Sequence, residues 1–325
     1  TMQLRAPKSL VPVRDDRSFL QLLADQIALL RRRNAARTPL LLMNSARTRQ
    51  RSLEALGELP QPDGLPLDFL QREVPRIDLA TALPVELAAE EARWAPPGHG
   101  GVYRALWGAG LLERLIEGGY RWAFASNADN LAATVDLDLL GHVDAAGVDF
   151  AMEVTPKTRA DVKGGTLVRR RGRLTLLERP QVPEDRLASF EDPASFSVFN
   201  TNNLWWRLEA VLERLRSGRL ELPMMLNRKR VGGAEIVQLE TAMGAASGCF
   251  ERSAGVRVTR DRFAPVKGTR DLLAARSDLF VVDDDGGLRR SPERPAGLPP
   301  PLIELDAAHF GSLDDFEQRF PHTPS

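Results

Sequence analysis

The sequence is poor in cysteine and in long apolar runs, and it carries no excess of either charge. Its single cysteine, Cys249, cannot form an internal disulfide or a multi-thiolate metal site, which favours a reducing compartment and a cytoplasmic protein. No apolar run approaches the roughly 18 residues that span a membrane, and the first residues do not resemble a signal peptide. The 44 cationic side chains balance the 44 acidic ones, so we expect neither a nucleic acid nor a membrane surface as a partner.

Lysine is also scarce, since only five of the 44 cationic residues are lysines and the others are arginines. A lysine offers a compact ammonium on a flexible stem, whereas an arginine offers a planar guanidinium. Lys8, Lys157, Lys163 and Lys267 all lie in segments that contain glycine or proline. Their clustering favours a polyphosphate held at several points, although each one alone is equally compatible with a solvated loop charge. Lys229 is interpreted as an ordinary surface charge.

The 325 residues suffice for one large or two ordinary domains with a buried core. Apolar residues recur at helical spacing over residues 19–34 and 101–118, and a short strand is predicted to end at Asn44. TLVRRRGRLTLLE predicts a hairpin that turns at Gly172, and the part after about residue 282 is expected to pack irregularly. Strands that alternate with helices predict an α/β fold with a mixed, mainly parallel sheet and helices on both faces.

Polar residues follow several of the predicted strands. In open α/β sheets, ligands bind beyond the carboxyl ends of the strands. Position alone therefore predicts one ligand-binding rim, made of Asn44 and Ser45, residues 127–130, residues 155–157, residues 200–203, and Lys267.

Asp129 is the candidate metal ligand of this rim. It lies between Asn127 and Asn130 with no His or Cys nearby in the sequence. A lone carboxylate among amides suits Mg²⁺, which completes its coordination with phosphates and water. The alternative is an aspartate that caps the next helix or shapes a turn. TPKTRADVKGGT, which contains Lys157 and Lys163, is compatible with a phosphate site or with a solvated basic loop.

Two further motifs offer hydrogen-bonding groups. PPGHGG lacks the spacing of a dinucleotide fingerprint, but it places flexible backbone directly before a helix, where a base or a phosphate could approach closely. His99 in this motif could donate to a ligand or satisfy a local hydrogen bond. FNTNN contains three amides that suit sugar hydroxyls, and its alternative role is an Asx turn at the end of a strand.

Nine motifs resemble, in this order, those of the eukaryotic-type UTP:glucose-1-phosphate uridylyltransferase family, also called UDP-glucose pyrophosphorylases. They are APKS, REVPRI, PPGHGGVYRAL, SNADNLAATVD, MEVTPKTRADVKGGTL, LLERPQVP, FNTNNLWW, VQLETAMGAA and PVKGTRDLLAARSDL. The resemblance extends from the first residue to about residue 320. It implies a Rossmann-like, GT-A-like nucleotidyltransferase fold. It also implies a Mg²⁺-dependent attack of glucose 1-phosphate on the α-phosphorus of UTP, which gives UDP-glucose and pyrophosphate.

The same resemblance implies roles for individual residues. Lys8 and Lys267 would hold phosphate oxygens as the catalytic cations, and Asp129 would hold Mg²⁺. Two sets of residues would bind the substrates: Gln71, Gly98, His99 and Asn127 the nucleotide, and Lys163, Gly165, Glu178, Asn200 and Asn202 the sugar and its phosphate.

The sequence departs from the family pattern in three respects. The family has a glycine-rich stretch, L-N-G-G-L-G-T, before the segment that aligns with Thr1, so residues 1–320 are expected to form a catalytic domain without that loop and to bind UTP weakly. Residues 321–325 are expected to lie where the family's C-terminal β-helix domain would begin, and a monomer is expected because that part usually mediates assembly. Ala6, Gly101 and NSARTR replace residues that are usual in the family, which affects local loop contacts.

Two alternatives stay open at this point. The acceptor could be another sugar 1-phosphate, such as galactose 1-phosphate or N-acetylglucosamine 1-phosphate. The protein could also be a binding module for UDP-sugars without turnover. The presence of both Lys8 and Asp129 favours the enzyme over the binding module.

Overall fold

A four-stranded sheet of mixed direction forms the centre of the protein. We describe it in a computed structural model that covers residues 2–4, 6–158, 161, 164–295, 298 and 301–322. Only β15 and β9 run parallel in this sheet, and β12 runs antiparallel to both of its neighbours. The strand order is β15 (Ser253–Arg257), β9 (Phe150–Pro156), β12 (Val198–Arg207) and β8 (Trp122–Ala125).

The expectation of a mainly parallel sheet is wrong for the residues that the structure describes. After β9 the chain forms the predicted hairpin of β10 (Thr166–Arg170) and β11 (Arg173–Leu177), and it then returns between β9 and β8 in the opposite direction as β12. A second parallel pair, β3 (Leu42–Asn44) and β4 (Asp68–Leu70), forms a sheet of its own. Periodicity reports which face of a strand is buried, but it does not report strand direction.

Helices cover both faces of the central sheet, as predicted. Along β9, Phe150 and Met152 contact the large core beneath α4, α5 and α8, whereas Ala151 points to the opposite face and packs with α6. Successive tryptophans of β12 divide in the same way, with Trp206 on the first face and Trp205 on the second. These helices are α4 (Val102–Gly108), α5 (Leu111–Glu117), α8 (Leu208–Arg216) and α6 (Leu137–Ala145).

Helix α1 (Phe19–Asn34) has the predicted bounds. The Ser18 side chain accepts from the backbone N–H of Gln21, while Gln21 accepts from Ser18, so a capping box begins the helix. The predicted helix over 101–118 is instead two helices, α4 and α5. Gly110 adopts a φ of 67° between them, a left-handed conformation that a continuous helix cannot contain.

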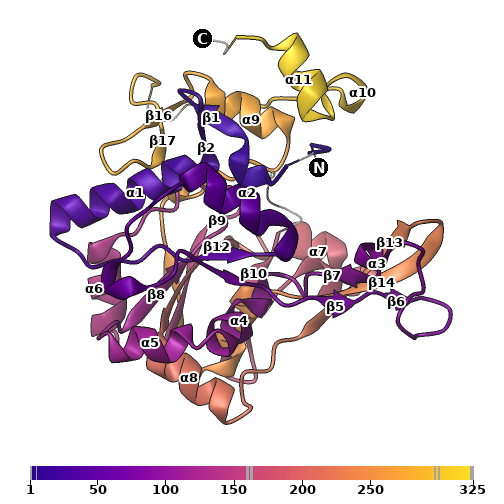
Figure 1. Cartoon of the computed structure of the whole chain (residues 1–325), viewed down its shortest axis with the longest axis horizontal. Coiled ribbons are helices and arrows are strands. Elements are labelled where there is room, and N and C mark those ends of the chain that lie inside the picture. The colour runs from indigo at the N-terminus through magenta and orange to yellow at the C-terminus, as the bar shows by residue number, and fades with distance from the viewer. Residues whose placement is uncertain are drawn as a thin grey trace.

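The two described ends of the chain lie side by side above the sheet (Figure 1). The backbone N–H of Leu313 donates to Met2 O at 2.9 Å, and a second apolar cluster joins Val11, Phe19, Leu272 and Phe316. The part after residue 282 is therefore more regular than expected. The elements of this region are β1 (Pro12–Arg14), β2 (Arg17–Ser18), α9 (Thr269–Arg276), β16 (Phe280–Val282), β17 (Leu288–Arg290), α10 (Ala307–Phe310) and α11 (Leu313–Arg319).

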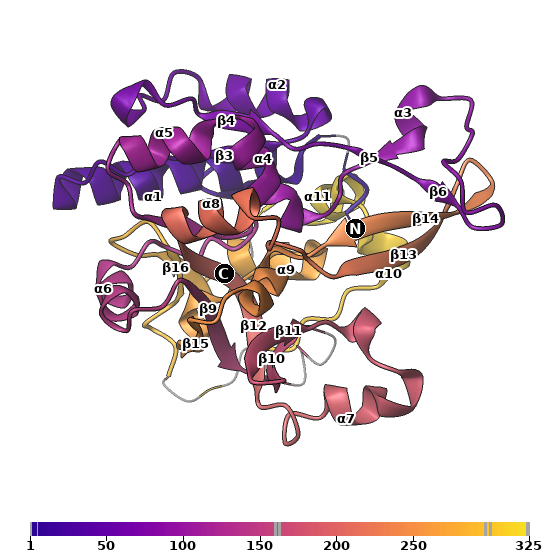
Figure 2. The same ribbon diagram turned by 90° about the horizontal axis from the view of Figure 1, so that it is seen from below.

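A three-stranded sheet projects from the side of the molecule (Figures 1 and 2). It consists of β13 (Met224–Val231), β14 (Ala234–Thr241) and β6 (Ile77–Asp78). The remaining elements are α2 (Ala46–Leu56), β5 (Val74–Pro75), α3 (Glu90–Arg93), β7 (Trp94–Ala95) and α7 (Leu187–Glu191). None of the helices described here is long and apolar enough to cross a membrane.

Candidate active site

Two lysines and one aspartate meet beyond the end of β8. Lys8 Nζ donates to Asp129 Oδ2 at 2.6 Å, and Lys267 Nζ lies 2.8 Å and 3.0 Å from the two oxygens of the same carboxylate. Lys8 belongs to a short 3-10 helix (Lys8–Leu10), and Lys267 precedes α9. The group carries two positive charges and one negative charge at a partly open position, which suits an anion with several oxygens.

The turn of residues 127–130 holds Asp129 in place through its backbone. Asn130 N donates to Asn127 O at 2.9 Å, and Val266 N donates to Asp129 O at 3.0 Å. Of the alternatives that the sequence left open, the structure shows the turn and not the helix cap: Asp129 lies in this turn, and its carboxylate faces the two lysines. The same backbone contact brings the segment before α9, and with it Lys267, against the turn.

The PPGHGG loop lies against Thr241, the last residue of β14. Gly98 has a φ of 78°, and a Cβ atom added to it would lie 2.5 Å from Thr241 O, so only glycine allows this approach. Gln71 Nε2 donates to Gly98 O at 2.7 Å, which places the two residues expected to bind the nucleotide in direct contact. Thr241 N donates to Pro97 O at 2.8 Å and fixes the loop from the other side.

His99 makes the local hydrogen bond that its sequence allowed. Its Nδ1 accepts the backbone N–H of Met243 at 3.0 Å, so the neutral ring carries its proton on Nε2 and keeps one donor free for a ligand. Burial of the ring lowers the pKa of His99 to about 4, and the positive charge of Lys267 contributes to this shift. One side of the residue still faces solvent. His99 is therefore a neutral hydrogen-bond donor at physiological pH.

An irregularity in β12 presents the amides of FNTNN. The register with β9 shifts between Asn200 and Leu204, so the motif forms a bulge inside the strand. The expected Asx turn is present, but within this bulge and not at the end of the strand. Asn202 adopts a φ of 62°, its N–H donates to Asn200 Oδ1 at 2.7 Å, and its Nδ2 donates to Asn127 Oδ1 at 3.1 Å. The buried Asn202 Oδ1 has no hydrogen-bond partner among the described residues, which leaves one acceptor for a ligand.

Glu178 and Gly165 lie next to this bulge. Gly165 O accepts the N–H of Asn200 at 2.9 Å, and a Cβ atom on Gly165 would lie 2.8 Å from the Glu178 carboxyl group. Burial raises the pKa of Glu178. Glycine thus leaves room for a carboxyl group beside the amides of β12, where hydroxyl groups could be bound.

Some residues of the predicted rim have other roles. Lys157 turns inward, where its Nζ donates to Phe190 O at 2.6 Å. Asn44 donates to Asp68 at 3.3 Å, and the Ser45 side chain caps α2. Lys229 donates to Gln238 on the neighbouring strand at 2.8 Å, as expected of a surface charge. Lys163 lies outside the described residues.

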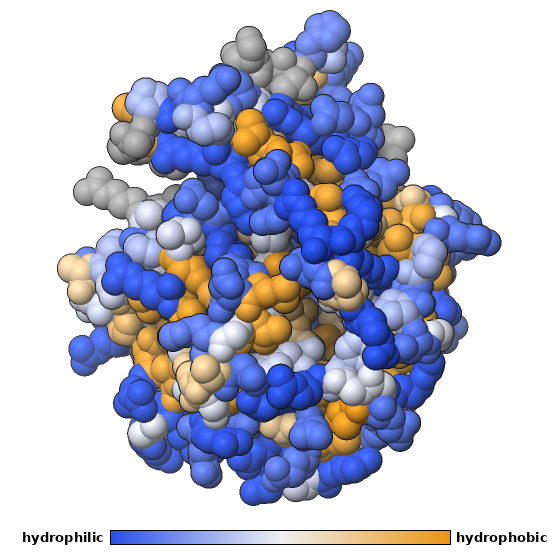
Figure 3. Space-filling view, turned by 90° about the vertical axis from the view of Figure 1, so that its left-hand side faces the viewer, coloured by the Kyte–Doolittle hydropathy of each residue, from blue (hydrophilic) through white to orange (hydrophobic). Residues whose placement is uncertain are grey.

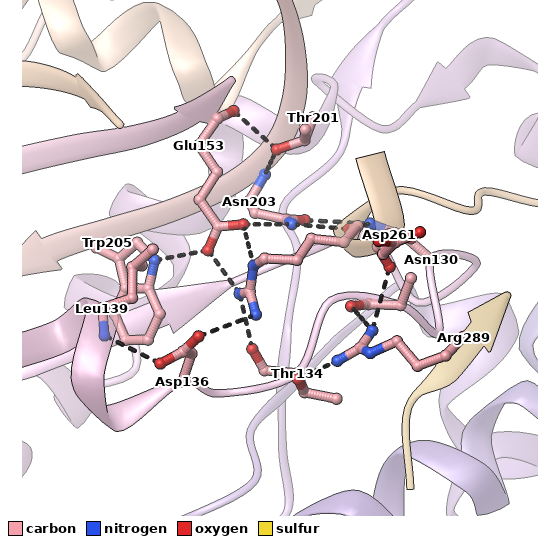
Figure 4. A network of polar contacts seen from close by, with 12 residues as sticks. Asn130, Thr134, Asp136, Leu139, Glu153, Thr201, Asn203, Trp205, Asp261 and Arg289 are labelled. Atoms are coloured by element: carbon pink, nitrogen blue, oxygen red, sulfur yellow. Dashed lines mark hydrogen bonds and ion pairs between the residues drawn. The ribbon is translucent and has the colours of Figure 1, made fainter. Parts of the chain in front are cut away.

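The sequence analysis missed a buried ion pair behind the site (Figure 4). Arg262 donates to both carboxylate oxygens of Glu153 at 2.8 Å and 2.7 Å. A charged residue inside the apolar strand DFAMEVTP was the available signal for Glu153. Arg262 had none, because it is one of many arginines in the chain.

A cavity of about 870 Å³ lies between α1, β3 and β8 and reaches the site. His99 and Asn127 belong to its lining together with Leu23, Ile27 and Ala123. Figure 3 views the molecule from this side and shows apolar side chains gathered around a hollow in a largely polar surface.

A family described as UTP–glucose-1-phosphate uridylyltransferase matches residues 1–325. The chain belongs to this family. It is 40% identical to the uridylyltransferase of Astragalus penduliflorus, with the match covering 100% of the chain and 69% of the relative. It is 42% identical to the enzyme of Saccharomyces cerevisiae, where 98% of the chain and 64% of the relative are covered.

Solved structures agree with this relationship. A variant of the UDP-glucose pyrophosphorylase from Leishmania major in complex with UDP-glucose superimposes with a TM-score of 0.90 at 38% identity, covering 100% of the chain and 72% of the relative. The UDP-glucose phosphorylase from Trypanosoma brucei superimposes with a TM-score of 0.88 at 38% identity, covering 97% and 70%. At these identities the similarity extends to the family and not to the fold alone.

Proposed function

We propose that the protein transfers the uridylyl group of UTP to glucose 1-phosphate and releases UDP-glucose and pyrophosphate. The observation that carries the proposal is the convergence of Lys8 and Lys267 on Asp129, in a chain that belongs to the uridylyltransferase family. The two lysines come from opposite ends of the chain. Two of the five lysines meet at one carboxylate, and compact ammonium groups suit phosphate oxygens, which supports the proposal.

The proposed reaction is an in-line displacement at phosphorus. A phosphate oxygen of glucose 1-phosphate forms a bond to the α-phosphorus of UTP, while the bond to the β-phosphate oxygen breaks and pyrophosphate leaves with the electron pair. No covalent protein nucleophile is needed, because positioning and charge neutralisation supply the catalysis. The ammonium groups of Lys8 and Lys267 can follow phosphate oxygens as negative charge moves toward the leaving group.

The remaining residues fit two ends of such a substrate pair. Gln71, Gly98 and the Nε2 of His99 would bind the nucleotide. Asn200, the unpartnered Oδ1 of Asn202 and the Glu178 carboxyl group would accept hydrogen bonds from sugar hydroxyls. The finer description of the fold as a Rossmann-like, GT-A-like nucleotidyltransferase domain is part of the same proposal.

Magnesium is the metal that we propose for this site. Among the described residues, no three acidic, histidine or cysteine side chains gather as metal ligands, and Asp129 is the carboxylate that we assign to the metal. A single hard oxygen ligand fits Mg²⁺, because this ion takes most of its ligands from phosphate groups and water. Once bound, the ion would neutralise charge on the phosphates of UTP. Asp129 would have to exchange part of its contact with the lysines for the metal.

Asp129→Asn tests this assignment. The amide keeps the size of the side chain but loses its charge, so we expect turnover to require a higher Mg²⁺ concentration. Mg²⁺ titration of the wild-type and variant proteins, followed by turnover, measures the shift. An unchanged titration would contradict the metal role of Asp129.

Pyrophosphate release from UTP and glucose 1-phosphate in the presence of Mg²⁺ tests the function itself. We expect release with glucose 1-phosphate and little with galactose 1-phosphate or N-acetylglucosamine 1-phosphate. Calorimetric binding of UDP-glucose accompanies the assay. Binding without release would favour a binding module, and preferred use of another sugar 1-phosphate would change the acceptor. The absence of both pyrophosphate release and UDP-glucose binding would refute the proposal.

A further inference from the structure

Glu153 is a fully buried carboxylate with a complete set of donors. It lies on β9, where Arg262 donates to it twice, Asn203 Nδ2 donates at 3.0 Å, and Trp205 Nε1 donates at 2.9 Å (Figure 4). A buried charge is costly to a protein unless it is paired and hydrogen-bonded. Even a paired one contributes little net stability, since a well-packed apolar pair of similar size is often as stable. Its presence next to the site therefore calls for a reason other than stability.

The first connection leads from Arg262 to Lys267. Arg262 ends a 3-10 helix, and its backbone oxygen accepts from Asn130 Nδ2 at 3.3 Å. Asn130 Oδ1 in turn accepts the N–H of Ala264 at 2.9 Å. Anchoring Arg262 at Glu153 thus lays the segment 262–267 along the turn that carries Asp129. Further along this segment, Val266 N donates to Asp129 O at 3.0 Å, directly before Lys267.

The second connection leads from Glu153 to Asn202. The Glu153 carboxylate accepts from Asn203 Nδ2 at 3.0 Å, and Asn203 N donates to Thr201 Oγ1 at 3.2 Å. Thr201 Oγ1 donates at 2.8 Å to the backbone oxygen of Glu153, a contact that does not depend on the carboxylate. Asn203 Oδ1 also accepts from Asn130 Nδ2 at 3.2 Å. Residues 201 and 203 are therefore held toward Glu153, and Asn202, between them, is left to contact Asn127 in the site.

We propose that Glu153 is a positioning residue that fixes the distance between the phosphate end and the sugar end of the site. Its carboxylate acts through Arg262 on Lys267 and through Asn203 on Asn202. The proposal rests on the proposed function for its catalytic consequence. Its structural part, the placement of segment 262–267, can be measured without turnover.

The test compares two ways of removing the pair. Glu153→Gln alone leaves Arg262 as a buried charge and is expected to lower stability strongly, so its effect on turnover is not decisive. The double variant E153Q/R262M removes both charges and keeps an acceptor for Trp205. We expect urea unfolding to show stability recovered relative to the single variant, while turnover stays about a hundredfold below wild type, as for other small misplacements of catalytic groups.

Asp149→Asn is the matched control. Asp149 lies directly before β9, at the other end of the strand, and accepts twice from Arg252 at 3.0 Å and 2.7 Å. Losing this ion pair should lower stability and leave turnover at the wild-type level. A double variant with recovered stability and wild-type turnover would overturn the proposal, because the pair would then be only structural.

Coupling to Lys267 separates positioning from a general loosening of the site. When E153Q/R262M is combined with Lys267→Ala, the loss of turnover should be clearly smaller than the product of the separate losses, because both changes act on one group. Independent, multiplying losses would overturn the connection through Lys267.

Amide hydrogen exchange decides the matter even if the proposed function fails. The amides of Ala264 and Val266 should exchange faster in E153Q/R262M and at the wild-type rate in Asp149→Asn. Unchanged exchange at both amides would overturn the proposal. Faster exchange in a protein that neither turns over nor binds UDP-glucose would uphold the positioning role and refute only the function.

Discussion

Asp129 receives its two lysines from far away in the chain, with Lys8 121 residues before it and Lys267 138 residues after it. All three side chains are partly open to solvent, so their contacts in the free protein contribute little to stability. These contacts matter for function because a bound ligand can replace them. A polyphosphate that enters the site can take both ammonium groups, because flexible lysine stems can follow its oxygens.

Lys8→Ala and Lys267→Ala are expected to lower turnover by about two to three orders of magnitude each, as for other groups that face charge in a transition state. The free energy of unfolding should change by about 1 kcal/mol or less, because each ion pair is partly open to solvent and Asp129 keeps the other lysine as a partner. Steady-state kinetics and urea unfolding measure the two effects. Lys229→Ala, on the projecting sheet, is the control and should leave turnover unchanged. Wild-type turnover in both site variants would refute the phosphate assignment.

His99 makes stability depend on pH in a defined direction. Its pKa lies near 4 in the folded protein and near 6.5 in the unfolded chain. Between these values the unfolded chain takes up a proton that the folded protein does not, so this contribution to stability is present above pH 6.5 and is lost as the pH falls toward 4. His99→Gln should show a smaller loss over this interval in urea unfolding. An NMR titration should find a neutral ring at pH 6, and a charged one there would contradict the inference.

Lys267→Ala should raise the pKa of His99, because it removes the nearby positive charge. Burial, the larger cause, stays in place, so the pKa should remain below its ordinary value. The same NMR titration, applied to the wild-type protein and to the Lys267→Ala variant, measures the difference in the pKa of His99.

At the scale of elements, the site depends on a loop and a bulge more than on regular strands. The loop before α4 passes so close to β14 that Gly98 admits no side chain, and the β12 bulge turns Asn202 toward the site. Both irregular segments are held by backbone hydrogen bonds from neighbouring strands. The neighbouring elements therefore fix the positions of the loop and the bulge that carry the ligand-binding groups.

Gly98→Ala is expected to lower the free energy of unfolding by about 2 kcal/mol or more, because the new Cβ atom would meet the backbone of Thr241 at a positive φ. Turnover should fall with it, since Gln71 contacts Gly98. Gly141→Ala in α6 is the matched control. Its Cβ atom has free space, and a helical alanine should raise stability by about 1 kcal/mol. Equal effects of the two substitutions on stability would contradict the close approach.

On the scale of the whole molecule, two apolar clusters hold different parts of the chain together. The larger one lies between the central sheet and α4, α5 and α8. The smaller one joins the first and last parts of the described chain and includes Val266, the residue before Lys267. The segments that carry Lys8 and Lys267 therefore depend on the smaller cluster.

Phe316→Ala is expected to destabilise the protein by about 3 to 5 kcal/mol, since Phe316 is 1% exposed and its removal leaves a cavity in the smaller cluster. Phe320→Ala, at a partly exposed ring that contacts Phe316, should cost less. Urea unfolding of the two variants measures the difference. Equal costs would show that the cluster does not hold the two ends together.

Local pattern was enough to predict several elements and part of the candidate site, whereas Gln71, Gly98, Gly165 and Glu178 came from the family resemblance. The apolar spacing of α1, the hairpin at Gly172 and the polar ends of the strands are set by neighbouring residues, so they can be read from short segments. Position also placed Asn127, Asp129, Asn202 and Lys267 on one rim, and in the structure Asn202 contacts Asn127 while Lys267 contacts Asp129. Lys157 was a wrong member of the rim, because sequence spacing does not tell which way a strand-end side chain turns.

The sequence alone determined the family, the class of chemistry and the residue types at the site, because long motifs and the small number of lysines can be read directly from the chain. Only the tertiary structure decided the direction of β12, the bulge that presents Asn202 and the partner of Glu153. Each of these depends on segments that lie far apart in the chain and meet only when the sheet forms. A buried carboxylate pairs with whichever arginine the fold places beside it. A linear sequence pattern does not contain that three-dimensional arrangement.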